Sequence, residues 1–181
     1  MTSISYTPLP DGGGPLRALY RVIDAGTKAI ERLLLLLCAL AIAIAMILTA
    51  VDVCLRYGFS RPLGWSFDFV MLYLMPAAYY FAFAHGMRMG AHLSVDFFAN
   101  SLPPRLMRVI YPALLAIAAA LVVLIGVLIS EEALSSFLAG ETLFGSVRWP
   151  TWPTAAIISV SFLVLALRLV LVAWRIAFFE E

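Results

Sequence analysis

The residues of this sequence that could bind a metal or a haem are its two histidines, His85 and His92. Their spacing of seven would place them on one face of a helix that continued between them. A haem in a membrane protein is held by histidines that project from facing helices, and the chain has no second histidine pair to supply them. Two histidines beside one aspartate also fall short of the ligand set of a metal site. We therefore expect neither a cofactor nor a bound metal.

The segment around His92 has the composition of an element at a membrane surface. His92 and Asp96 are four residues apart and would meet on one helical face. Phe97 and Phe98 follow and would dip into the edge of the bilayer. We expect an amphipathic interfacial segment here, between the second and third membrane helices.

Catalytic side chains are missing from the apolar parts of the chain. The sequence contains no catalytic triad, phosphate-binding loop, metal-ligand cluster or intramembrane pair of carboxylates. One charge, Arg168, lies in the last apolar run, close enough to its end for the long side chain to extend to the headgroups. These features predict a protein that is not an enzyme.

The composition requires an apolar solvent. Of the 181 residues, 64% are hydrophobic and 13% are charged, and the mean hydropathy is +1.00. A soluble domain is nearer half apolar and a quarter charged, so this chain could not cover itself with polar side chains. The net charge of +1 argues against a nucleic-acid-binding protein, which would carry a basic face. Cys38 and Cys54 lie in or at the end of an apolar run, which favours buried thiols over a disulfide.

Four continuous apolar runs predict an all-α integral membrane protein with four transmembrane helices. Each run approaches the twenty or so residues that cross a hydrocarbon core of about 30 Å, and none alternates as a barrel strand does. The first run is longer than the apolar region of a signal peptide, so we expect it to be retained. The predicted organisation is a flexible and amphipathic N-terminal tail (1–27), a membrane domain (28–175) with spans at about 33–53, 69–87, 109–130 and 153–174, and a C-terminal tail (176–181).

The basic residues predict the orientation of these spans. Nine of the twelve would lie on one side of the membrane: Arg17, Arg21, Lys28, Arg32, Arg88, Arg105, Arg108, Arg168 and Arg175. The other side would carry Arg56, Arg61 and Arg148. Because short loops rich in Lys and Arg stay in the cytoplasm, we expect both termini there, in a multi-pass membrane protein.

The first loop has the features of a well-anchored turn. Asp52 and Arg56 are four residues apart and should form an ion pair on one helical face. Ser66 is a candidate N-cap for the next helix, and Asp68 suits the positive end of that helix dipole. Trp65 suits the membrane interface. The loop could serve only to anchor two helices, or it could also dock a partner.

The third loop allows the same two interpretations. It contains Glu141 and Arg148, and its two tryptophans, Trp149 and Trp152, are separated by proline and threonine in a stiff segment typical of a membrane-interface anchor. In the span between these loops, Pro76 lacks the N–H that an internal helical residue donates, so it should kink the helix.

The order of these motifs resembles the small membrane subunit of tripartite ATP-independent periplasmic (TRAP) transporters, the DctQ-like small permease family. The first matching motif is Arg56-Tyr57-x-Phe59-x-x-Pro62-Leu63-x-Trp65-Ser66, followed by Asp68. The second is Arg88-x-Gly90-x-His92-x-x-Val95-Asp96. The family commonly has two acidic residues after the Trp-Ser pair, whereas this chain has Phe67 and then Asp68. The resemblance covers roughly residues 28–175.

The resemblance implies a non-catalytic subunit of the bacterial inner membrane that scaffolds a large multi-span permease and helps to dock a periplasmic solute-binding protein. Transport in the family is driven by a cation gradient, and the solute is often a small organic acid. We expect the partner contacts on the periplasmic side, at Arg56, Trp65, Asp68, Glu141, Arg148 and Trp149. Two other hypotheses are a haem- or quinone-binding anchor of a respiratory complex and a stand-alone channel or exporter.

Overall fold

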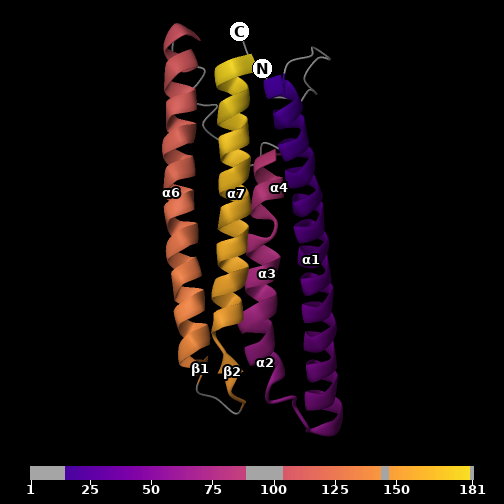
Figure 1. The fold of residues 1–181 in the computed structure, drawn as a ribbon. Helices are drawn as coiled ribbons and strands as arrows, with labels where there is room; N and C mark the ends of the chain where they lie inside the picture. The colour runs from indigo at the N-terminus through magenta and orange to yellow at the C-terminus, as the bar shows by residue number, and fades with distance from the viewer. Residues whose placement is uncertain (1–14, 89–103, 144–146, 180–181) are drawn as a thin grey trace.

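The computed structural model describes residues 15–88, 104–143 and 147–179, and most of these are helical. Three long helices stand beside a column of shorter helical pieces (Figure 1). The long helices are α1 (Pro15–Phe59), α6 (Pro104–Ala139) and α7 (Trp152–Phe179). Each of them contains a stretch that is long and apolar enough to cross a membrane. The prediction of an all-helical membrane protein is confirmed to this extent.

Helix α1 is one element of 45 residues, which is about 67 Å at the usual rise per residue. The sequence predicts a tail that ends at residue 27, but the helix runs through this position without a break. Spacings of alternately four and three residues keep one face of α1 buried from its polar beginning into its apolar part. The residues of this stripe are Tyr20, Asp24, Thr27, Glu31, Leu34, Cys38 and Ala41. The described beginning of α1 therefore packs against the bundle.

Residues 66–88 form a broken column where the sequence predicts one span. Helix α2 (Ser66–Phe69) leads into a π-helical turn, η1 (Val70–Leu74). Helices α3 (Met75–Tyr80) and α4 (Phe83–Arg88) follow, with a turn between them. None of these pieces alone has the length of a membrane crossing, so the fourth crossing stays a prediction.

The change from η1 to α3 coincides with Pro76, where the sequence predicts a kink. Pro76 has no N–H, so the carbonyl of Leu72, four residues earlier, loses its usual helical donor. The hydroxyl of Thr154, at the start of α7, donates a hydrogen bond of 2.7 Å to this carbonyl. The interruption of the column is therefore compensated by its packing on α7.

Helix α7 lies at the centre and contacts α1, α3, α4 and α6. Helix α6 lies at one flank and packs chiefly on α7, where Leu115 and Ala119 meet Leu169 (Figure 1). Further along this interface Gly126 allows close approach, because a Cβ there would lie 3.1 Å from Cδ2 of Leu163. The opposite flank is formed by α1, and Ala41 of its buried stripe packs on Val70, Leu74 and Ala77 of the column.

Two short connections lie at one end of the bundle, one from α1 to α2 and the other from α6 to α7. The strands β1 (Thr142–Leu143) and β2 (Trp149–Pro150) form a small antiparallel pair, with Thr142 opposite Pro150. We call the end formed by residues 52–66 and 140–151 the loop end. Helix α1 begins and helix α7 ends at the opposite end (Figure 1).

Candidate functional site

A cluster of charged side chains lies inside the bundle between α1 and α7. Arg168 is fully buried, and its guanidinium donates to Asp24 at 2.8 Å and to the fully buried Glu31. Lys28 forms a further ion pair with Asp24 at 2.7 Å. These four side chains bring opposite charges into contact, and such pairing is the condition under which buried charges are tolerated.

The position of Arg168 corrects the expectation that its side chain reaches the headgroups. Arg168 follows Trp152, the first residue of α7, by sixteen residues, which is about 24 Å along the helix. This is less than the roughly 30 Å of a hydrocarbon core, and the side chain points into the bundle, where the carboxylates of α1 bind it. The apolar spans therefore enclose a paired set of charges.

The sequence analysis missed this cluster because Asp24 falls in the predicted N-terminal tail and Glu31 lies just before the first predicted span. The signal that could have found them is the stripe of α1, in which polar residues occupy positions of the heptad pattern that continue the apolar face. An acidic side chain at such a position requires a buried cation from elsewhere in the chain. Arg168 was the single charge available in the last apolar run.

At the loop end an aromatic cluster joins the first and third loops. Trp65 and Trp149, both predicted partner-contact residues, have ring centroids 6.5 Å apart. Phe69 and Tyr73 pack against Trp149, with centroids 5.5 and 5.8 Å away. The hydroxyl of Tyr73 also donates a 2.6 Å hydrogen bond to the carbonyl of Pro150. Segments far apart in the sequence therefore form one surface.

The first loop follows the prediction in one respect and corrects it in another. Arg56 and Asp52 form the expected ion pair at 2.9 Å, and Asp52 also accepts the N–H of Leu63 at 2.7 Å. Ser66 is not the N-cap of α2: Trp65 occupies that position, and the Ser66 hydroxyl donates to the Leu63 carbonyl at 2.9 Å. This local hydrogen bond replaces the capping bond, because a serine hydroxyl bonds readily to a nearby backbone group. Asp68 lies in the first turn of α2, as predicted.

Glu141 is held at the end of α6 by a glycine turn. Gly140 has a positive φ of 64°, a conformation that glycine adopts without strain and that commonly ends a helix. The turn brings the Glu141 carboxylate within 3.0 Å of the Ser136 hydroxyl, which donates to it. The backbone carbonyl of Glu141 accepts the N–H of Thr151 at 3.2 Å.

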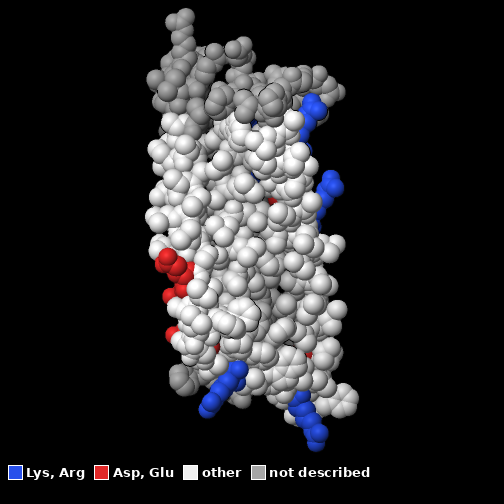
Figure 2. All heavy atoms as spheres, viewed as in Figure 1, with Lys and Arg blue, Asp and Glu red and all other residues white. Residues whose placement is uncertain are grey.

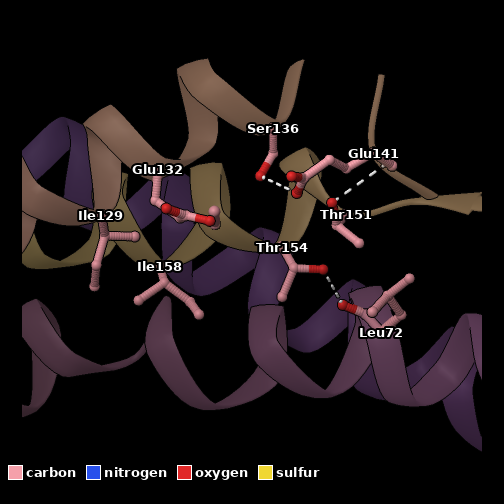
Figure 3. Close-up of a pocket in the computed structure, with 9 residues that line it drawn as sticks. Leu72, Ile129, Glu132, Ser136, Glu141, Thr151, Thr154 and Ile158 are labelled. Carbon is pink, nitrogen blue, oxygen red and sulfur yellow. Dashed lines mark hydrogen bonds between the residues drawn. The ribbon is translucent and has the colours of Figure 1, made fainter. Parts of the chain in front are cut away.

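An open groove lies beside Glu141, between α6, α7 and η1 (Figure 3). Its volume is about 470 Å³. Its apolar lining is Leu72, Ile129, Ala155 and Ile158, and its polar lining is Glu132, Ser136, Glu141, Thr151 and Thr154. No basic residue is among these lining residues, so the groove combines an apolar floor with an acidic rim.

The charges on the visible face of the molecule are separated by sign. In Figure 2, carboxylates gather on the flank formed by α6, and basic side chains project from the loop end. Arg56 and Arg148 are exposed, and Asp68 is half-buried. The predicted contact residues of the first and third loops thus share one end of the molecule. The predicted interfacial residues His92, Asp96, Phe97 and Phe98 lie outside the described residues.

Comparison with protein families decides the class. Residues 45–178 match the model of the tripartite ATP-independent periplasmic transporters, DctQ component. The chain belongs to this family. No curated protein and no solved structure matches the chain. As a DctQ-family protein it is a small, multi-pass membrane component of a TRAP transporter, which is a non-catalytic class of protein.

The family match covers some of the features described above and leaves others outside it. The match includes the loop end, the groove and Arg168, but it begins after Asp24 and Glu31. The DctQ family works with a large permease and a solute-binding protein in a three-part system. The comparisons give no support to the respiratory-anchor hypothesis.

Proposed function

We propose that this DctQ-family chain crosses the inner membrane four times, with both termini in the cytoplasm, and scaffolds the large permease of its transporter. We further propose that its loop end faces the periplasm and helps to dock the solute-binding protein during cation-gradient-driven uptake of a small organic acid. The observation that carries the docking proposal is the aromatic cluster that joins Trp65 to Trp149. A rigid surface assembled from two loops is what a soluble partner needs to recognise.

The orientation is supported by the distribution of basic residues. The half of α1 away from the loop end carries Arg21, Lys28 and Arg32. With the buried Arg168 left out, the proposed orientation assigns eight of the remaining eleven basic residues to the cytoplasmic side. The fourth crossing is supported by the hydrogen bond from Thr154 to Leu72. A column interrupted by proline is tolerated in lipid when a neighbouring helix supplies the missing donor.

The docking contacts are assigned to Arg56, Trp65, Asp68, Arg148 and Trp149, with Glu141 bracing the third loop. Arg56 and Arg148 are exposed basic groups beside a partly exposed aromatic surface. Arginine and aromatic residues are among the residue types enriched at the centres of protein interfaces. The exposed side chains Tyr57, Phe59 and Phe67 extend the same end of the molecule.

The scaffold role is tested by purifying the tagged chain from its native membrane in mild detergent. A large multi-span permease should co-purify, and its absence would contradict the proposal. The docking role is tested by binding of the solute-binding protein to the co-purified permease complex in nanodiscs. The double variant Asp68→Ala with Arg148→Ala should weaken this binding, whereas Arg32→Ala, at the opposite end, should leave it unchanged. Equal binding by the double variant and the wild type would refute the assignment.

A further inference from the structure

The groove between α6, α7 and η1 carries a second kind of interaction surface, distinct from the loop end. Helix α6 packs chiefly on α7, and much of its remaining described surface is apolar and exposed, as at Leu121, Leu124, Leu128 and Leu134. Lipid alone can cover such a surface. Lipid tails cannot, however, satisfy the carboxylates that border the groove.

The position of Glu132 along the bundle shows why lipid is a poor neighbour for its carboxylate. The hydroxyls of Ser130 and Ser159 are hydrogen-bonded to each other, which fixes the register of α6 against α7. Ser159 lies seven residues into α7 from Trp152, and Glu132 lies two residues from Ser130 toward the loop end. Glu132 is therefore about 7 Å farther into the bundle than Trp152 along the helix axis. A tryptophan at the start of a membrane helix marks the headgroup level, so Glu132 lies on the hydrocarbon side of it.

The partners within the chain do not neutralise this rim. Ser136 donates to Glu141, but a hydroxyl leaves the formal charge in place. Among the residues that the structure describes, no basic side chain forms an ion pair with Glu132 or Glu141. The contrast is with Asp24 and Glu31, whose charges are matched inside the bundle. An exposed carboxylate at this depth is costly unless water or a cation covers it. The neighbouring Glu131 is also exposed, but only Glu132 lines the groove, where an occupant would cover its carboxylate.

We propose that this groove binds a transmembrane helix of the large permease, and that this helix carries an arginine or lysine near its periplasmic end. The apolar floor of Leu72, Ile129 and Ile158 accepts the helix, and Glu132 with Glu141 binds its cation. The inference rests on the proposed function, because it takes the large permease as the neighbour. It specifies which face of the chain contacts the permease, and that the permease supplies a positive charge there.

The first experiment places the photo-reactive amino acid benzoylphenylalanine at position 158, in the groove, and separately at position 47, on an exposed face of α1. Ile47 is 63% exposed, and it does not line the groove. Illumination of membranes from cells that express the whole transporter should crosslink position 158 to the large permease, with little crosslinking from position 47. Crosslinking of position 158 to lipid alone, to a second copy of this chain or to the solute-binding protein would overturn the proposal.

The second experiment uses adjacent, matched variants. Glu132→Gln removes the charge that lines the groove, while Glu131→Gln removes an exposed charge that does not line it. Association is measured by energy transfer between labelled chain and labelled permease in liposomes, as the subunits are diluted with lipid. Glu132→Gln should weaken association about tenfold or more, as loss of one partner of a close interfacial charge pair does, and Glu131→Gln should not.

The outcomes separate this inference from the proposed function. If the wild-type chain retains the permease but both glutamine variants associate as the wild type does, the groove assignment fails and the scaffold role stands. If the wild-type chain retains no large permease, the proposed function fails and the inference fails with it. Both glutamine substitutions keep the size of an exposed side chain, so misfolding does not confuse the comparison.

Discussion

Removing the buried guanidinium of Arg168 should be among the most damaging single substitutions in this protein. In Arg168→Met the side chain keeps a similar length and loses its charge. Asp24 retains Lys28 as a partner, but the fully buried Glu31 loses the guanidinium that binds it. The damage is therefore concentrated on one carboxylate, and a second substitution can repair it.

The expected magnitudes follow from this geometry. Breaking a buried ion pair by deleting one partner costs about 3–5 kcal/mol, because the other charge is left uncompensated. Replacing both partners by neutral groups of similar size is often nearly neutral. The double variant Arg168→Met with Glu31→Gln should therefore be more stable than Arg168→Met alone, with a coupling energy of about 2–3 kcal/mol.

The free energy of unfolding can be measured in mixed micelles with increasing dodecyl sulfate, followed by tryptophan fluorescence. Trp174 is a suitable reporter because it packs edge-to-face on Tyr20, with ring centroids 6.4 Å apart, on the same pair of helices as the cluster. The matched control is Arg32→Met, an exposed arginine next to Glu31 on α1. It should change the free energy of unfolding by no more than about 0.5 kcal/mol.

Two results would refute the reasoning. In the first, Arg168→Met costs no more than Arg32→Met, which would mean that the Arg168 side chain reaches water or headgroups. In the second, the destabilisations of Arg168→Met and Glu31→Gln simply add in the double variant. Additivity would mean that the two side chains do not interact.

Other variants test the packing and the proposed orientation. Thr154→Val should lower the free energy of unfolding by about 1–3 kcal/mol in the same assay, because it removes the hydroxyl that donates to the Leu72 carbonyl of η1. This cost should be smaller in a Pro76→Ala background, where residue 76 has a backbone N–H to donate. Equal costs in the two backgrounds would contradict the reasoning. Gly126→Leu should force α6 away from α7 at about 1–3 kcal/mol, whereas Gly26→Leu, in open space on a helix surface, should be neutral or stabilising. Arg148→Cys in an otherwise cysteine-free chain should react with a membrane-impermeant maleimide added to spheroplasts; labelling only in inverted vesicles would reverse the proposed orientation.

Local features of this protein were predictable from the sequence. The apolar runs of α6 and α7 are continuous, and a backbone in lipid must satisfy its own hydrogen bonds, so these runs had to be helices. Asp52 and Arg56 are four residues apart on one helix, which brings them together whatever the rest of the chain does. The site of the irregularity in the second span followed from the missing N–H of Pro76.

Features that depend on contacts between distant segments were mispredicted or not predicted. A serine before a helix can cap it or bond to a nearby carbonyl, and the turn at Leu63 decided the role of Ser66. The tryptophans were expected at the membrane interface, but nothing in their spacing indicated that Trp65 would lie beside Trp149. The groove at Glu132 exists only because α6 packs chiefly on α7 and leaves a gap beside η1.

By itself, the sequence determined that this chain is a membrane protein made of helices, because its apolar residues exceed what any water-soluble fold could bury. It also carried the resemblance to the DctQ family in the motifs at residues 56–68 and 88–96, and the family model matches residues 45–178. Only the tertiary structure decided what Arg168 does. The same arginine extends to the headgroups if α7 exposes it and binds Glu31 if α1 covers it, and that choice depends on packing between helices more than a hundred residues apart in the chain.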